Sequence, residues 1–163
     1  IDLTKNWNVS FDTKMGGPAS YELEELTSWT DVELEGIKYY SGTATYTKEF
    51  DLEEGQFLNA KAIHLAFEDI QELARISVNG NDAGYIWTPP YAANITKQLK
   101  PGTNKITVEV INTWNNRIVG DLSNPDQPPF TKTNAVGKFK ANGSLLKSGL
   151  IGKAELIFTE NKE

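Results

Sequence analysis

The chain has 163 residues, 39% of them hydrophobic, and its 16 basic and 22 acidic side chains give a formal net charge of −6 at pH 7. This length supports one well-buried core and is short for two, so we expect a single domain over residues 1–163. The negative charge opposes binding to nucleic acids and anionic membranes, and the absence of cysteine excludes disulfides, thiolate metal sites and cysteine nucleophiles.

Apolar stretches are short throughout the chain. None approaches the roughly 18 to 20 residues needed to span a bilayer, and the first residues, IDLTKNW, lack the charged-then-apolar order of an export signal. The sequence begins without methionine, which suggests a processed protein or a piece of a longer one. Together with the charge, these features predict neither nucleic acid nor a membrane as a partner.

Alternation of apolar and polar residues at a period of two dominates the chain. It occurs in runs at residues 7–11, 44–50, 63–67, 76–78, 106–110 and 156–158. Turn-forming residues separate the runs, as in NGNDAG at 79–84 and KPGTN at 100–104. Short alternating strands at this spacing favour an all-β sandwich or jelly roll over a parallel α/β sheet.

Three stretches depart from this pattern, and no window of eleven or more residues shows a convincing helical period. Residues 21–34 are acidic and could supply a turn or two of helix. Residues 112–134 begin with NTWNNRIVGD and contain three of the seven prolines, and residues 137–152 are rich in glycine. Because 112–121 follows the strand expected at 105–111, we expect it to form a loop at one end of the sandwich.

The order of motifs over residues 6–158 resembles a known family. YYSGTATYTKEF (39–50) is followed by the continuous stretch from AFEDIQEL to EVINTW (66–114), and SGLIGKAEL (148–156) lies near the end. This order is similar to the sugar-binding β-sandwich domain of glycoside hydrolase family 2 enzymes. It is closer to the equivalent domain of family 106 α-L-rhamnosidase-like enzymes. The resemblance implies an all-β, galactose-binding-like jelly-roll β-sandwich that accompanies a catalytic barrel in a much larger polypeptide.

The amide-rich stretch supplies the first candidate site. Amides and charged groups hydrogen-bond to sugar hydroxyls, and aromatic faces cover the apolar side of a sugar ring. The residues that provide this mixture are Trp114, Asn115, Asn116, Arg117 and Asp121. The resemblance implies that this segment reaches toward the pocket of a neighbouring catalytic domain. The alternative is structural: Arg117 and Asp121 pair, Trp114 seals the end of the sandwich, and the amides satisfy backbone groups.

A second candidate site lies in YIWTPPY, where Trp87 and Tyr91 flank a rigid proline pair. An exposed aromatic pair would form a stacking platform for a sugar, whereas a buried pair would only close the edge of the sandwich. Trp7 alternates with apolar neighbours and is expected in the core. The orientation of Trp29 is not determined by its surroundings in the sequence.

Catalytic and metal-binding patterns are missing from the sequence. The single histidine, His64, alternates with buried positions and is expected to face solvent, so no transition-metal site can be built. No cofactor is expected. A structural calcium ion is an alternative, because some domains of this fold bind one. Adjacent carboxylates such as Glu68 and Asp69 point to opposite faces of a strand, unlike the facing pair of a glycosidase.

Three functions follow in order of preference. The first is a non-catalytic, carbohydrate-associated accessory domain of a large glycoside hydrolase, which lends a loop to the active-site rim or packs on the catalytic domain. The second is an autonomous carbohydrate-binding module that uses Trp87, Tyr91 and Trp114. The third is a purely structural sandwich with an exposed apolar patch near residues 145–151. The expected partners are carbohydrate and the catalytic domain of the same polypeptide, and the resemblance implies a periplasmic or extracellular bacterial location.

Overall fold

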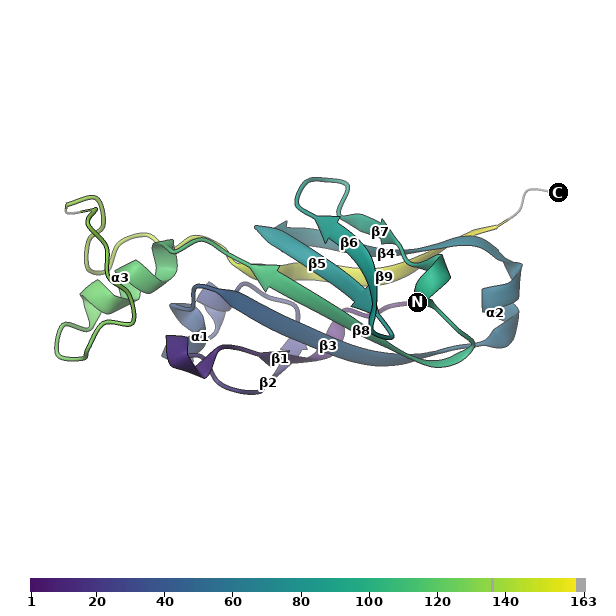
Figure 1. The fold of residues 1–163 in the computed structure, drawn as a ribbon, viewed down its shortest axis with the longest axis horizontal. Helices are drawn as coiled ribbons and strands as arrows, with labels where there is room; N and C mark the ends of the chain where they lie inside the picture. The colour runs from purple at the N-terminus through teal and green to yellow at the C-terminus, as the bar shows by residue number, and fades with distance from the viewer. Residues whose placement is uncertain (136, 161–163) are drawn as a thin grey trace.

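The structure, a computed structural model, describes residues 1–135 and 137–160 and is a sandwich of two antiparallel sheets (Figure 1). Its strands are β1 (Lys5–Ser10), β2 (Tyr21–Glu25), β3 (Thr43–Leu52), β4 (Ala60–Gln71), β5 (Leu73–Val78), β6 (Asn81–Ile86), β7 (Ala92–Asn94), β8 (Gly102–Ile111) and β9 (Gly149–Glu160). Its helices are α1 (Glu35–Lys38), α2 (Glu54–Asn59) and α3 (Asn115–Ser123), with 3-10 turns η1 (Thr13–Met15), η2 (Trp29–Asp31) and η3 (Thr96–Gln98).

The two sheets differ in size. The larger has the strand order β2-β1-β3-β8-β5-β6 and the smaller has the order β7-β4-β9. Non-consecutive strands pair in both sheets, as when β3 pairs with β8 over Thr43–Leu52 and Gly102–Ile111. The expected all-β, galactose-binding-like jelly-roll sandwich is confirmed. Among the described residues, no helix is long and apolar enough to cross a membrane.

One hydrophobic core fills the space between the sheets. Inward positions alternate with outward ones, as along β8, where Ile106, Val108 and Val110 are buried. Trp7 is fully buried, as its alternation predicted. Trp29 is also buried. Its indole Nε1 donates a 2.5 Å hydrogen bond to the Tyr46 hydroxyl, which satisfies this polar group inside the core. The alternation thus places large side chains from both sheets in one continuous cluster.

The tight turn between β5 and β6 follows its sequence signal. Asn79 and Gly80 have φ values of 52° and 79°. Positive φ at both central positions is the geometry of the type I′ hairpin turn, which Asn-Gly favours. The Asn79 amide also donates 2.8 Å and 2.9 Å hydrogen bonds to Asn104 Oδ1 and the Gln98 carbonyl.

The prediction for residues 21–34 is corrected in part. Residues Tyr21–Glu25 form strand β2, in which Leu23 is buried against the core, and only Trp29–Asp31 forms a 3-10 turn. The three-residue spacing of Leu23 and Leu26 therefore does not reflect a helix. Pairing with β1 across Trp7 and Leu23 decides the conformation instead.

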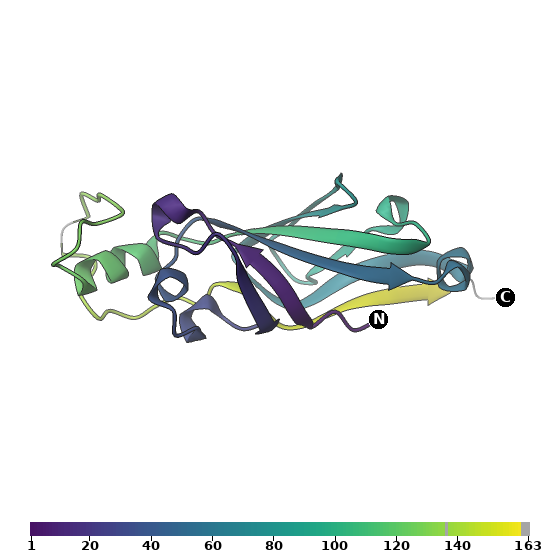
Figure 2. The ribbon, with the colours of Figure 1, turned by 90° about the horizontal axis from the view of Figure 1, so that it is seen from below.

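The prediction for 112–121 is corrected in part: the segment lies at one end of the sandwich as expected, but residues 115–121 belong to the helix α3 and not to a loop. This helix lies beyond one end of the sandwich, and α2 lies at the opposite end (Figures 1 and 2). Its buried residues are the five consecutive positions 116–120. The apolar residues Ile118, Val119 and Leu122 do lie on one side of the helix, but nine residues are too few to fill a window of eleven in which a helical period can be recognised.

Candidate functional site

The centre of the candidate site is a buried ion pair on α3. Arg117 and Asp121 are four residues apart, a spacing that places both side chains on one face of a helix. Arg117 Nε lies 3.0 Å from Asp121 Oδ1, and the two side chains are 6% and 8% exposed. The Nε–H does not point at that oxygen with hydrogen-bond geometry, and Nε has no other hydrogen-bond partner. The contact is therefore electrostatic, and the guanidinium keeps hydrogen-bonding capacity.

Asp121 also ties α3 to the following segment. Its second oxygen, Oδ2, accepts hydrogen bonds from the backbone N–H of Thr131 at 2.9 Å and from the Thr131 hydroxyl at 2.7 Å. The preceding residue, Phe130, lies with its ring centroid 4.8 Å from the Arg117 guanidinium. This geometry is a cation–π contact, so the helix and the 124–131 segment hold the guanidinium from two sides.

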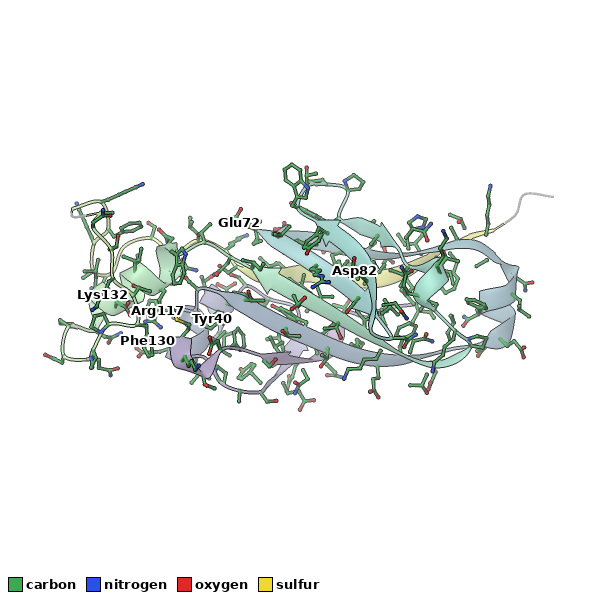
Figure 3. All side chains as sticks on the ribbon, viewed as in Figure 1. Tyr40, Glu72, Asp82, Arg117, Phe130 and Lys132 are labelled. Atoms are coloured by element: carbon green, nitrogen blue, oxygen red, sulfur yellow. The ribbon has the colours of Figure 1, made fainter. Side chains whose placement is uncertain are left out.

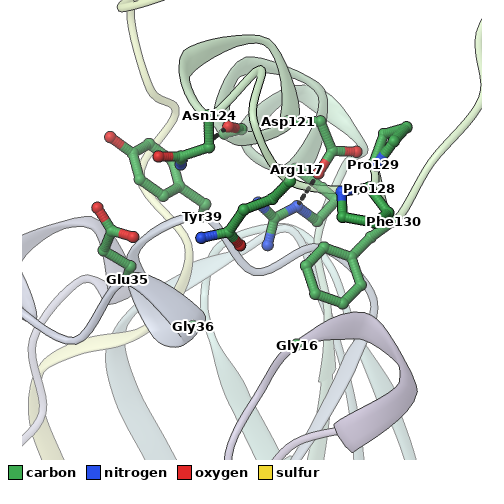
Figure 4. A pocket seen from close by; sticks show the side chains of 12 residues that line it. Gly16, Glu35, Gly36, Tyr39, Arg117, Asp121, Asn124, Pro128, Pro129 and Phe130 are labelled. Atoms are coloured by element: carbon green, nitrogen blue, oxygen red, sulfur yellow. Dashed lines mark hydrogen bonds and ion pairs between the residues drawn. The ribbon is translucent and has the colours of Figure 1, made fainter.

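A cavity of about 150 Å³ opens beside this pair (Figure 4). Figure 4 shows Arg117 and Asp121 projecting from α3, with Glu35 and Gly36 of α1 across the cavity. The lining residues come from four segments of the chain: Gly16, Glu35, Gly36, Tyr39, Arg117, Gly120, Asp121, Asn124, Gln127, Pro128, Pro129 and Phe130. Carboxylate, guanidinium and amide groups line this cavity together with aromatic and proline rings, a combination suited to sugar hydroxyls and C–H groups.

Gly120 is required by the position of the arginine. A Cβ added at Gly120 would lie 2.6 Å from Arg117 Nη2 and 2.6 Å from the Tyr39 Cβ. Both distances are far below van der Waals contact, so any side chain here would displace the guanidinium or Tyr39. The glycine in RIVGD therefore serves the packing of Arg117.

The amides of the motif are occupied by the protein itself. Asn116 is 1% exposed, and its amide donates to the Leu146 carbonyl at 2.7 Å and accepts from the Leu146 N–H at 2.8 Å. Asn115 donates to the Ser144 carbonyl at 3.1 Å. Asn112 donates to Ser148 Oγ at 3.0 Å. These bonds fix the segment that returns to β9, which favours the structural alternative for Asn115 and Asn116.

Trp114 lies outside the cavity. It is 57% exposed and lines a second, more open groove of about 570 Å³. Apolar side chains dominate that groove, with two lysines and no acidic residue: Met15, Trp114, Ile118, Phe130, Thr131, Lys132, Thr133, Ala135, Lys138 and Phe139. Phe130 lines both spaces and separates them. Figure 3 shows Arg117, Phe130 and Lys132 gathered at the α3 end.

The structure does not bring Trp87 and Tyr91 to the α3 end. They lie on the connection between β6 and β7, beside the body of the sandwich in Figure 1. Trp87 is 71% exposed, whereas Tyr91 is partly buried and packs against the core. A neighbouring aromatic that the sequence reasoning missed, Tyr85, is also exposed and lies 5.8 Å from the Arg75 guanidinium.

Metal-binding geometry does not occur in the described part of the chain. Across residues 1–135 and 137–160, no three His, Cys, Asp or Glu side chains converge as ligands. His64 is only partly exposed, on an outward position of β4. The apolar run at 145–151 is divided, because Leu146 is exposed while Leu150 is fully buried in the core.

Sequence reasoning found Arg117 and Asp121 but missed their neighbours. Glu35, Tyr39, Asn124, Gln127 and Phe130 line the same cavity. Glu35 and Tyr39 belong to α1 and the residue after it, about eighty positions earlier in the chain, so no local spacing connects them with the motif. The proline pair before Phe130 marked an irregular segment but gave no direction for its side chains.

Comparisons with known proteins point to one family. Residues 24–143 match the family model of the glycosyl hydrolase 2 galactose-binding domain-like proteins. The protein named "Putative beta-glucuronidase" from Formosa agariphila is 35% identical, in an alignment that covers 96% of this chain and 15% of that protein. The structure of a rhamnosidase from Novosphingobium sp. PP1Y is similar with a TM-score of 0.87 at 34% identity, and the match covers 96% of this chain and 14% of that one.

A more distant structure shares the fold. The beta-glucuronidase of Ruminococcus gnavus gives a TM-score of 0.58 at 24% identity over 69% of this chain and 20% of its own. The chain thus spans only 15% and 14% of the first two relatives, which are much larger proteins.

Proposed function

This chain belongs to the glycosyl hydrolase 2 galactose-binding domain-like family, and we propose that it is a non-catalytic, carbohydrate-associated accessory domain of a large glycoside hydrolase. The α3 end contributes the Arg117 cavity to the rim of the active site on the catalytic domain of the same polypeptide. The supporting relatives are large proteins whose names specify glycoside hydrolases.

The observation that carries the proposal is the cavity beside Arg117. It combines a buried guanidinium with amides and rings at an end of the sandwich, beyond the sheets, where a neighbouring domain can approach. The non-catalytic role is supported by Asp121. One of its oxygens lies against Arg117 and the other accepts two hydrogen bonds from Thr131, so this carboxylate is held in place and is not free to transfer protons or attack a sugar.

The test uses the full-length protein that contains this chain. We expect Gln127→Ala, which alters the cavity without touching the core, to raise KM for an oligosaccharide substrate several-fold while kcat changes little. Leu58→Ser is the matched control, since Leu58 is exposed on α2 at the opposite end of the sandwich. Equal kinetics for the Gln127 variant and the control would contradict a role at the rim.

An autonomous carbohydrate-binding module is the second candidate, favoured by the exposure of Trp87. A solvent-exposed indole is a suitable stacking surface for a sugar ring. This function predicts that a polysaccharide binds the 163-residue chain and that Trp87→Ala removes the binding. Retention of full affinity by that variant would exclude the role of Trp87.

A further inference from the structure

The cavity between α1 and α3 has the dimensions of a site for a single sugar residue. Its volume is about 150 Å³, well below the roughly 300–1,000 Å³ of pockets that hold drug-sized ligands. An oligosaccharide would not fit inside it. One pyranose ring, inserted from the open side, is the carbohydrate that matches this space.

Hydrogen-bonding groups face the cavity with unused capacity. Arg117 is more than nine-tenths buried and its Nε is enclosed beside Asp121, so only its terminal guanidinium nitrogens can reach a ligand. The Asn124 amide donates to the Gly120 carbonyl at 3.2 Å, which leaves its Oδ1 as an acceptor. Glu35 and Gln127 both line the cavity with exposed side chains, so their carboxylate and amide can reach a ligand. Donors and acceptors from two sides of the cavity can therefore bind adjacent hydroxyls of a ring.

The charges around the cavity determine which sugars fit. The positive charge of Arg117 is balanced by Asp121 at 3.0 Å, so the carboxylate of Glu35 leaves the lining with one net negative charge. Lys38 lies 5.8 Å from the centroid of the Tyr39 ring and does not line the cavity. Glu35 is exposed at the open side of the cavity, where a ligand carboxylate would add a second negative charge, and solvent reduces their repulsion without removing it.

We propose that this cavity binds one uncharged pyranose through its vicinal hydroxyls and discriminates against a uronic acid, with Glu35, Asn124 and Gln127 as ligand residues beside Arg117. The inference rests on the proposed carbohydrate-associated function and specifies its ligand class. Tyr39, Pro128 and Pro129 supply the apolar contacts to the C–H face of the sugar.

The test is an NMR titration of the 163-residue chain with matched methyl glycosides. Methyl β-D-glucopyranoside and methyl β-D-glucuronide differ only in the carboxylate at C6, and the galacto-, manno- and rhamnopyranosides extend the neutral set. We expect saturable shifts in α1, α3 and residues 124–130 with at least one neutral sugar. The panel includes the methyl uronide of the same ring configuration for each neutral sugar, and we expect the uronide of the sugar that binds to bind about tenfold more weakly.

Two variants and one control locate the site. Gln127→Ala should weaken the neutral sugar at least fivefold, and Glu35→Gln should reduce the discrimination against the uronide to about threefold or less. Trp114→Ala, in the neighbouring groove, should leave the affinity unchanged.

Three results would overturn the inference. They are preferential binding of the uronide, shifts confined to the Trp114 groove or to Trp87, and no binding by any sugar of the panel. None of them decides the rim function, which depends on the kinetics of the full-length Gln127 variant. Unchanged kinetics there would reject the proposed function on its own.

Discussion

At the scale of single residues, the buried Arg117–Asp121 pair is costly to disturb. Both side chains are almost fully buried, so removing one charge leaves the other without compensation in a poorly solvated site. Asp121→Asn keeps the shape and an acceptor for Thr131 but removes the charge. We expect it to lower the free energy of unfolding by about 3 kcal/mol, measured by urea denaturation.

A second arginine–aspartate pair provides the control. Arg75 Nε lies 2.9 Å from Asp82 Oδ1, at nearly the same distance, but these side chains are about half exposed. Asp82→Asn should therefore cost less than about 1 kcal/mol. Equal costs for the two asparagine variants would show that burial of the α3 pair contributes nothing.

Tyr46 gives the core a dependence on alkaline pH. Burial raises the pKa of its hydroxyl from 10.0 to about 12, despite opposing hydrogen bonds from Trp29 and Leu150. Above pH 10 the unfolded chain releases this proton more readily than the folded chain. The stabilisation is therefore complete below pH 10 and declines as pH rises toward 12, by roughly 3 kcal/mol in total.

Denaturation at pH 9 and pH 11.5 checks this expectation. Tyr46→Phe is the reference, because it cannot ionise, although it loses stability at every pH by leaving Trp29 Nε1 without its 2.5 Å acceptor. The difference between the two proteins should shrink as the pH rises. A constant difference would mean that Tyr46 ionises in the folded state as easily as in the unfolded state.

At the scale of elements, two helical glycines should respond oppositely to the same substitution. In α3, Gly120→Ala places a Cβ 2.6 Å from Arg117 Nη2, so overpacking should cost about 1–3 kcal/mol despite the better helix propensity of alanine. In α2, Gly55 has no atom within 4 Å of the same Cβ, so Gly55→Ala should be neutral or stabilise by up to about 1 kcal/mol. Thermal unfolding of both variants tests the pair, and stabilisation by both would refute the close packing of Arg117.

The elements differ in how well their sequences predict them. Strand β8 was predictable because Ile106, Val108 and Val110 alternate with polar residues, as expected for a strand with one buried and one solvent-exposed face. Helix α3 was not predicted, since its one-sided apolar pattern spans only nine residues and lies in a stretch dominated by amides and turn formers. The short helices α1 and α2 likewise carry too few residues for a period to be visible.

The candidate site shows the same limit at the level of its side chains. Chemistry alone singled out Arg117 and Asp121, since charged groups next to amides and a tryptophan in one irregular segment form a mixture suited to sugars. Glu35 and Tyr39 reach the cavity only because the fold brings α1 against α3. Contacts of this kind are properties of the tertiary structure, and no pattern within either segment encodes them.

At the scale of the whole molecule, we expect the α3 end to be separable from the sandwich. The buried residues Ile118 and Val119 of α3 do not belong to the continuous core between the sheets. Residues 113–147 form an insertion between β8 and β9, and its two ends meet, because Asn112 Nδ2 lies 3.0 Å from Ser148 Oγ. We therefore expect that a short glycine-serine linker can replace residues 113–147 without moving β8 or β9.

We expect the shortened protein to unfold in one cooperative transition. Its free energy of unfolding should be lower by about 1–3 kcal/mol, because contacts such as the 3.0 Å hydrogen bond from the backbone N–H of Arg117 to Ser41 Oγ are lost. The aromatic cluster of Phe11, Trp29 and Tyr40 should keep its near-ultraviolet circular dichroism, because those rings pack on one another inside the sandwich. Sugar binding in the α1–α3 cavity should disappear, because Arg117 and Gln127 leave with the insertion. Loss of the cooperative transition would instead show that the sandwich needs α3 to fold, so that the two form one folding unit.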